Sequence, residues 1–174
     1  MKIFVVGMLA GLGVAGMICA APVSERNAQD VIATFLCLRY PAPATAAGQT
    51  KTAAGQSALA VTTLEPLRDS AGRTLGYIAH LTPAGFVLVR ADDTAPPLKL
   101  YSTDCPFENL PPWAIEAFSG ELGQELDVIE RARANGQALA DTYTAQWREL
   151  QAGVSRTPIG LNDFSVSAPM AGPL

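Results

Sequence analysis

Residues 74–102, TLGYIAHLTPAGFVLVRADDTAPPLKLYS, decide the fold of this chain. Short runs of β-branched, aromatic and aliphatic residues alternate there with turn residues such as Thr82-Pro83-Ala84-Gly85, in which Pro and Gly favour tight connections. Strands joined by short turns pair most simply as antiparallel neighbours. With one further run upstream, the sequence predicts an antiparallel sheet of about four strands, at residues 59–67, 74–81, 86–91 and 98–101.

Helical patterns flank this strand region on both sides. Upstream, apolar residues recur at helical spacing over residues 24–38, and Ser24 is the expected N-cap. Downstream, residues 113–129 carry an apolar face and residues 138–150 form another helical stretch. The expected fold class is therefore α+β, a single domain with helices packed on one side of the sheet.

Three aromatic side chains of the downstream helices are the expected cover of that sheet. They are Trp113, Phe118 and Trp147. We expect all three to be buried, because a helix of a soluble domain seldom places a Trp in solvent.

The N-terminus has the pattern of a secretory signal peptide over residues 1–20. Lys2 precedes an apolar run over residues 3–18, and small residues follow it. Ala20 fits the position before a cleavage site, which predicts a mature, secreted or periplasmic chain that begins at Ala21. A retained membrane helix and a lipoprotein anchored through Cys19 are the alternatives. The anchor fits less well because Ile18, which is not a small residue, precedes Cys19.

The rest of the chain divides into an expected domain, residues 21–151, and an expected flexible tail, residues 152–174, rich in Gly, Pro, Ser and Ala. The chain has 12 Lys and Arg against 16 Asp and Glu, a formal net charge of −4. An acidic surface argues against a nucleic-acid partner. We expect no stable membrane insertion once the leader is removed.

The reactive side chains are few. Cys37 and Cys105 remain after removal of the leader, and in an oxidising compartment they are candidates for one disulfide. Alternatively Cys37, which lies in an apolar stretch, packs as a small hydrophobic residue. No motif places either thiol beside the single histidine, His80, as cysteine-peptidase chemistry requires. We therefore expect no catalytic residue, and the spacing of His, Cys and carboxylates predicts no metal site or cofactor.

Several motifs resemble those of one known family. They are Gly85-Phe86 at the start of a strand, Ala91-Asp92-Asp93 after it, Pro97 before the strand that ends in Tyr101-Ser102, and Phe107 a few residues later. This arrangement resembles the Spi inhibitor and streptopain propeptide family, over most of the mature chain. The resemblance implies an α+β domain that holds a streptopain-type cysteine peptidase inactive, as its own prosegment or as a separate inhibitor.

The resemblance also implies a partner-binding loop. In that family the loop after the Tyr-Ser strand lies toward the protease, which makes Phe107, Glu108, Asn109 and Leu110 the expected contact residues. Alternatively Asn109 merely caps the next helix or turns the chain. For Asp92-Asp93 we expect a structural role, with a carboxylate bound to backbone amides of the following turn or to an inward-facing donor.

No papain-like peptidase domain follows in the sequence, so we expect a non-catalytic protein that inhibits a streptopain-like cysteine peptidase. The alternative is a structural or binding module, or a remnant of a prosegment, without inhibitory activity.

The leader has a direct test. Expression of the full-length chain in a bacterium should yield an exported protein whose intact mass corresponds to a start at Ala21. Ala20→Arg should abolish processing, because the position before the cleavage site requires a small residue. A mass that includes a lipid on Cys19 would contradict simple cleavage.

Overall fold

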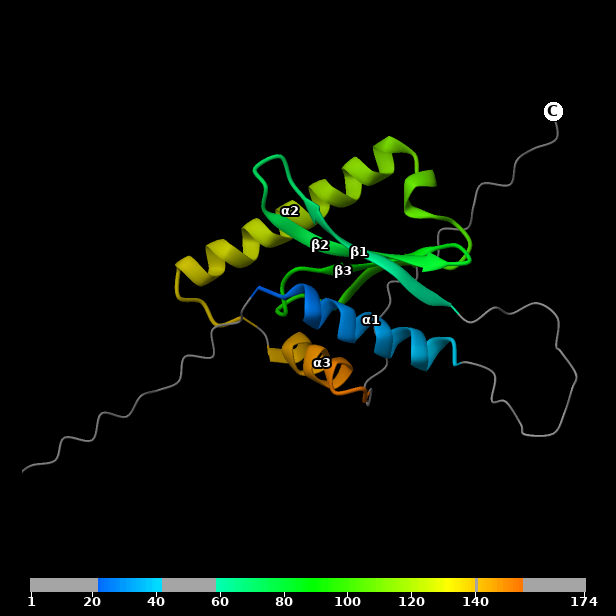
Figure 1. Ribbon diagram of the computed structural model, residues 1–174. Coiled ribbons are helices and arrows are strands. Elements are labelled where there is room, and N and C mark those ends of the chain that lie inside the picture. The colour runs from blue at the N-terminus through cyan, green and yellow to red at the C-terminus, as the bar shows by residue number, and fades with distance from the viewer. Residues whose placement is uncertain (1–21, 42–58, 140, 155–174) are drawn as a thin grey trace, which may run out of the picture.

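The computed structural model describes residues 22–41, 59–139 and 141–154 (Figure 1). The expected signal peptide and residues 155–174 of the expected tail lie outside the described residues. The helices and strands are α1 (Glu25–Arg39), β1 (Ala60–Arg68), β2 (Thr74–Thr82), β3 (Phe86–Arg90), β4 (Leu98–Ser102), the 3-10 turn η1 (Phe107–Asn109), α2 (Pro112–Ala134) and α3 (Asp141–Gln151).

The strands form one antiparallel sheet in the order β1-β2-β3-β4, which confirms the predicted meander. At two glycines, the backbone of a neighbouring strand comes too close for any side chain. A Cβ on Gly76 would lie 2.4 Å from the carbonyl oxygen of Val89, and one on Gly85, whose φ is +108°, would lie 2.3 Å from that of Ser102. Both positions therefore require glycine.

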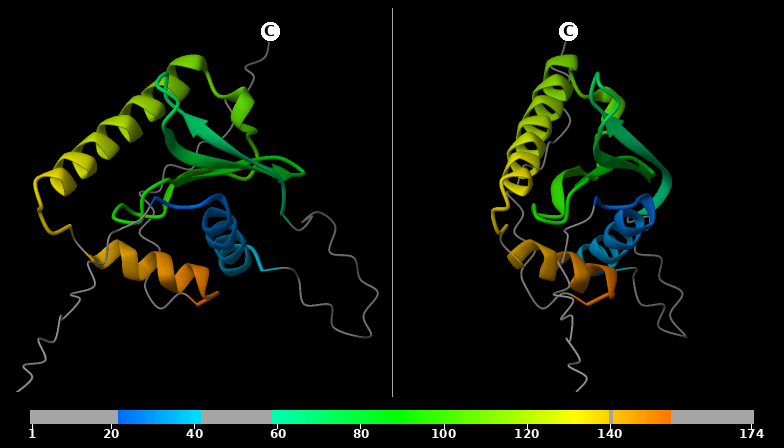
Figure 2. Two further views of the ribbon diagram at one scale, coloured as in Figure 1. Left: turned by 60° about the vertical axis from the view of Figure 1, so that its left-hand side comes forward. Right: turned by 90° about the vertical axis from the view of Figure 1, so that its left-hand side faces the viewer.

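The helices cover both faces of the sheet, so the prediction that they pack on one side is wrong. In Figure 2, α1 and α3 lie on one side of the sheet and α2 on the other. All five residues of β3 are buried: Val87 and Val89 pack with α1 and α3, and Phe86 and Leu88 pack with α2. An uninterrupted apolar strand is typical of a sheet covered on both faces.

Helix α1 forms as its sequence predicts. The Ser24 side chain accepts a hydrogen bond from the backbone N–H of Asn27 at 3.2 Å and caps the helix. Its buried face, which includes Val31, Ile32 and Phe35, packs against the sheet. No helix in the described part of the chain is long and apolar enough to cross a membrane.

The two tryptophans have opposite environments. Trp147 is 1% exposed and donates its indole N–H to the carbonyl of Ala95 at 2.9 Å. Phe118 is half-buried against the α2 side of the sheet, as predicted. Trp113, however, is 71% exposed, so its predicted burial is wrong. Trp113 and Leu122 are nine residues, or two and a half helical turns, apart, so they lie on opposite sides of α2.

Ion pairs fix α2 to the sheet and to the β1–β2 turn. Arg90, at the end of β3, binds Glu125 through Nε at 2.8 Å and Nη2 at 3.2 Å, and its Nη1 donates to the carbonyl of Leu98 at 2.8 Å. Burial alone would raise the pKa of Glu125, but the hydrogen bonds and charges of Arg90 and Lys99 outweigh it and lower that pKa. At the β1–β2 turn, Arg73 binds Asp127 at 2.7 Å.

A matched pair of variants tests this placement of the tryptophans. Trp147→Ala should lower the free energy of unfolding by about 3–5 kcal/mol, because it opens a cavity and leaves the Ala95 carbonyl without its donor. Trp113→Ala should change it by less than about 0.5 kcal/mol in dilute solution. Urea denaturation followed by circular dichroism measures both. Equal losses would show that the helix faces are assigned wrongly.

Candidate functional site

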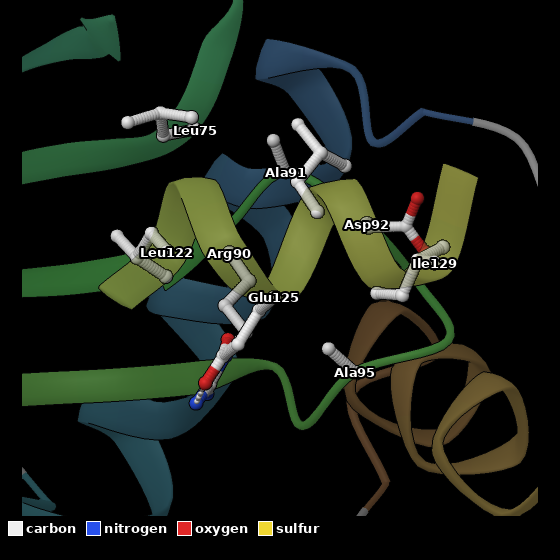
Figure 3. Close-up of a pocket in the computed structure, with 9 residues that line it drawn as sticks. Leu75, Arg90, Ala91, Asp92, Ala95, Leu122, Glu125 and Ile129 are labelled. Carbon is white, nitrogen blue, oxygen red and sulfur yellow. Dashed lines mark hydrogen bonds and ion pairs between the residues drawn. The ribbon is translucent and has the colours of Figure 1, made fainter. Parts of the chain in front are cut away.

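The cavity between α2 and the end of the sheet is too small for a substrate. Its volume is about 10 Å³, room for roughly one water molecule. Figure 3 shows that Arg90 and Glu125, the charged pair in its wall, point toward each other. Their hydrogen-bonding groups are therefore already used within the protein.

A larger hollow, of about 400 Å³, lies between α1 and the start of β1. Leu36, Leu59 and Val61 give it an apolar wall, and its polar side chains are Gln29, Cys37 and Tyr40. The pKa of Tyr40 is raised, mainly by burial and secondly by a hydrogen bond with Tyr101. Its phenol is therefore not a base at neutral pH. Because no imidazole or carboxylate lines the hollow, it lacks a base for the Cys37 thiol.

The two cysteines are free thiols, so the candidate disulfide is not formed. Cys37 is exposed on α1, whereas Cys105 is buried among the residues that pack between the sheet and α2. The sheet separates the two side chains, which rules out the geometry of a disulfide bond.

His80 contacts two carboxylates rather than either thiol. Its Nε2 is 3.2 Å from Glu65 Oε1, and its Nδ1 is 2.9 Å from Glu108 Oε1. Glu65 belongs to β1 and Glu108 to η1, so this contact ties the predicted loop to the sheet. Within the described ranges, no group of three or more His, Cys, Asp and Glu residues could hold a metal ion.

Half of the predicted contact residues belong to the core. Phe107 is 7% exposed and packs edge-on against Phe86, with ring centres 5.2 Å apart, and Leu110 is buried beside it. Both were predicted to contact a partner, and in the structure of the chain alone both hold the loop on the sheet. Glu108 and Asn109, between them, are exposed.

Asn109 turns the chain but does not cap α2. Its backbone N–H donates to the carbonyl of Pro106 at 3.1 Å, within η1. The N-cap of α2 is Pro111, and no side chain caps this end of the helix. The capping alternative for Asn109 is therefore wrong, and its side chain is left on the surface.

Trp113, three residues beyond this loop, was not predicted as a contact residue from the sequence. Pro112 occupies the first position of α2, and Trp113 follows it on the outer side of the helix. We name the exposed set Glu108, Asn109, Pro111, Pro112 and Trp113 the loop surface. The spacing of Trp113 from the apolar residues of α2 was the available signal, since it places the Trp outside their stripe.

Asp92 and Asp93 follow β3 and differ from each other. Asp92 is buried, pairs with Arg133 through both oxygens at 2.8 and 2.9 Å, and accepts the backbone N–H of Thr94 at 3.0 Å. This confirms its predicted structural role. In Asp93, Oδ1 is buried and has no hydrogen-bond partner among the described residues. Burial, and then the Asp92 charge, raises the pKa of Asp93.

These adjacent residues should therefore respond oppositely to the same substitution. At pH 7, Asp92→Asn should cost roughly 1–3 kcal/mol, because it weakens the pair with Arg133. Asp93→Asn should stabilise the protein, because the native state disfavours the charged form of this carboxylate, whose Oδ1 is buried without a hydrogen-bond partner among the described residues. Since the raised pKa belongs to the folded state, the gain should disappear as the pH falls below about 3.9, the ordinary Asp value. Urea denaturation from pH 7 to pH 3 measures both effects, and loss of stability in Asp93→Asn at pH 7 would contradict this account.

Comparisons with protein-family models, with curated proteins and with solved structures find no match to this chain. The resemblance to the streptopain propeptide family stays a prediction from the sequence.

Proposed function

We propose that this protein is an exported, non-catalytic domain that binds and blocks a streptopain-like cysteine peptidase, as a separate inhibitor or as a prosegment. One observation carries the proposal: Trp113, the second residue of α2, is 71% exposed and follows within five residues of exposed Glu108 and Asn109, which lie on the loop that the sequence resemblance implies as the contact. Tryptophan is among the residues that most often dominate the energy of a protein interface.

The loop surface is held in place before any partner arrives. Phe107 and Leu110 anchor the loop in the core, and the contact of Glu108 with His80 ties it to β2. The loop therefore loses little conformational freedom on binding, which favours affinity. We assign the anchor role to Trp113 rather than to Phe107, whose ring is occupied within the domain.

The positions of the reactive groups support a binding role. Cys37 and Cys105 lie on opposite faces of the sheet, and His80 contacts Glu65 and Glu108 rather than either thiol. The two hollows described above offer one water-sized space and one apolar groove. The proposed mechanism is steric: the loop surface occupies the approach to the substrate cleft of the peptidase.

The test is a titration of a streptopain-type cysteine peptidase with the purified protein, followed by residual activity on a peptide substrate. We expect stoichiometric loss of activity. Trp113→Ala should weaken inhibition by about thirtyfold or more, and Asn109→Ala by roughly fivefold to tenfold. Asp30→Ala, on the exposed side of α1 far from the loop, is the matched control and should inhibit like the wild type.

Two results would count against the proposal. If no inhibition appears at micromolar excess, the protein is a structural or binding module, or a prosegment remnant, with respect to that peptidase. If inhibition occurs but Trp113→Ala and Asn109→Ala inhibit as strongly as Asp30→Ala, the peptidase binds a different surface.

A further inference from the structure

The outer side of α2 is an uncovered surface with an unusual composition. Figures 1 and 2 show α2 at the outside of the molecule, across the sheet from α1 and α3. The exposed residues that share this side of the helix are Trp113, Ala117, Gly120, Gln124, Val128 and Arg131. The stripe residues between Trp113 and Arg131 carry no charge, and two exposed carboxylates border them: Glu116, and Asp127, which binds Arg73. Val128 is 62% exposed, so both ends of the uncharged part carry large apolar side chains in water.

The fold of the single chain does not explain the glycines of this helix. Gly120 lies on the outer stripe and Gly123 beside it, both within α2, where glycine weakens a helix. A Cβ added at either position would meet no atom within 4 Å. Internal packing therefore does not require glycine here. At Gly120, the missing side chain leaves room for another backbone to come close from outside.

We propose that α2 pairs antiparallel with α2 of a second copy of this chain, across a two-fold axis near the middle of the helix. With Gly120 opposite Gln124 of the second copy, Ala117 faces the second Val128, and Trp113 faces the second Arg131. The stripe is then self-complementary in size, because Gln124 and Val128 each meet a small residue. A two-fold axis repeats every such contact, as an isologous interface requires.

The charges along α2 fit the same arrangement. Among the described residues Glu116 and Arg131 have no ion-pair partner, whereas Glu121 and Asp127 already bind Lys99 and Arg73. Antiparallel pairing brings Arg131 of one copy near Glu116 and the Trp113 ring of the other. Each end of the interface thus gains an ion pair and a cation–π contact. Parallel pairing would instead place Glu116 beside Glu116.

Self-association would also cover the most exposed tryptophan of the described chain. Because Trp113 belongs to the loop surface as well, a second copy and a peptidase would compete for it. The pairing itself does not depend on the peptidase, so it can be tested with the protein alone.

The experiment is sedimentation velocity of the protein expressed from the full-length chain, from about 1 to 100 µM, where a weak dimer is populated. We expect a reversible monomer–dimer equilibrium. Gly120→Leu should weaken the dimer by roughly tenfold to hundredfold, because the added side chain holds the two backbones apart. It should not unfold the monomer, since Leu is the better helix former and the site is open. Gly123→Leu makes the same change beside the stripe and is the control.

Charge reversal gives a second, independent arm. Glu116→Arg alone should weaken the dimer, and Glu116→Arg with Arg131→Glu should restore it, because the pair is re-formed with opposite polarity. Asp30→Lys, on α1, should leave the dimer unchanged. A protein that stays monomeric at about 100 µM, or a dimer that Gly120→Leu and Glu116→Arg both leave intact, would overturn the proposal.

Discussion

The burial of β3 on both faces is the constraint on which the rest of the structure depends. Val87 and Val89 pack against α1 and α3 on one face of the sheet. Phe86 and Leu88 pack against α2 and the ring of Phe107 on the other. An apolar strand cannot leave either face in water without a large free-energy cost. The loop that carries Glu108 and Asn109 is therefore a product of the same packing, because its anchors fill the space beside Phe86.

The parts of the fold that follow from local rules were predictable from the sequence. The hydrophobic period predicts the four strands, and the turn residues between them predict their antiparallel order. The Ser24 cap follows from the capping chemistry of serine. The side on which each helix packs is a tertiary property, and the continuous apolar run of β3 was its only local sign. The candidate disulfide could not be judged from the sequence for the same reason, because it is the sheet that separates Cys37 from Cys105.

The candidate site was only half predictable. The loop was located through a family resemblance, but a resemblance between motifs does not tell which of its side chains point inward. Phe107 and Leu110 are buried because apolar groups gain most from the core, which leaves the polar Glu108 and Asn109 outside. Trp113 runs against that trend. An exposed tryptophan beside an anchored loop is the kind of local exception that marks function more often than stability.

Helix α2 shows why the inner and outer sides of one element cannot be interpreted separately. Arg90 holds the inner side of α2 through Glu125, and Arg73 holds its edge through Asp127, so the helix is fixed in rotation as well as in position. That rotation decides that Trp113, Gly120 and Val128 face outward. Loss of the Arg90–Glu125 pair would therefore allow α2 to rotate. The rotation would move the side chains of the outer surface, although neither Arg90 nor Glu125 lies on that surface. If the outer side of α2 pairs with a second copy as proposed, that pairing depends on the ion pairs beneath α2 as well as on the side chains that the second copy touches.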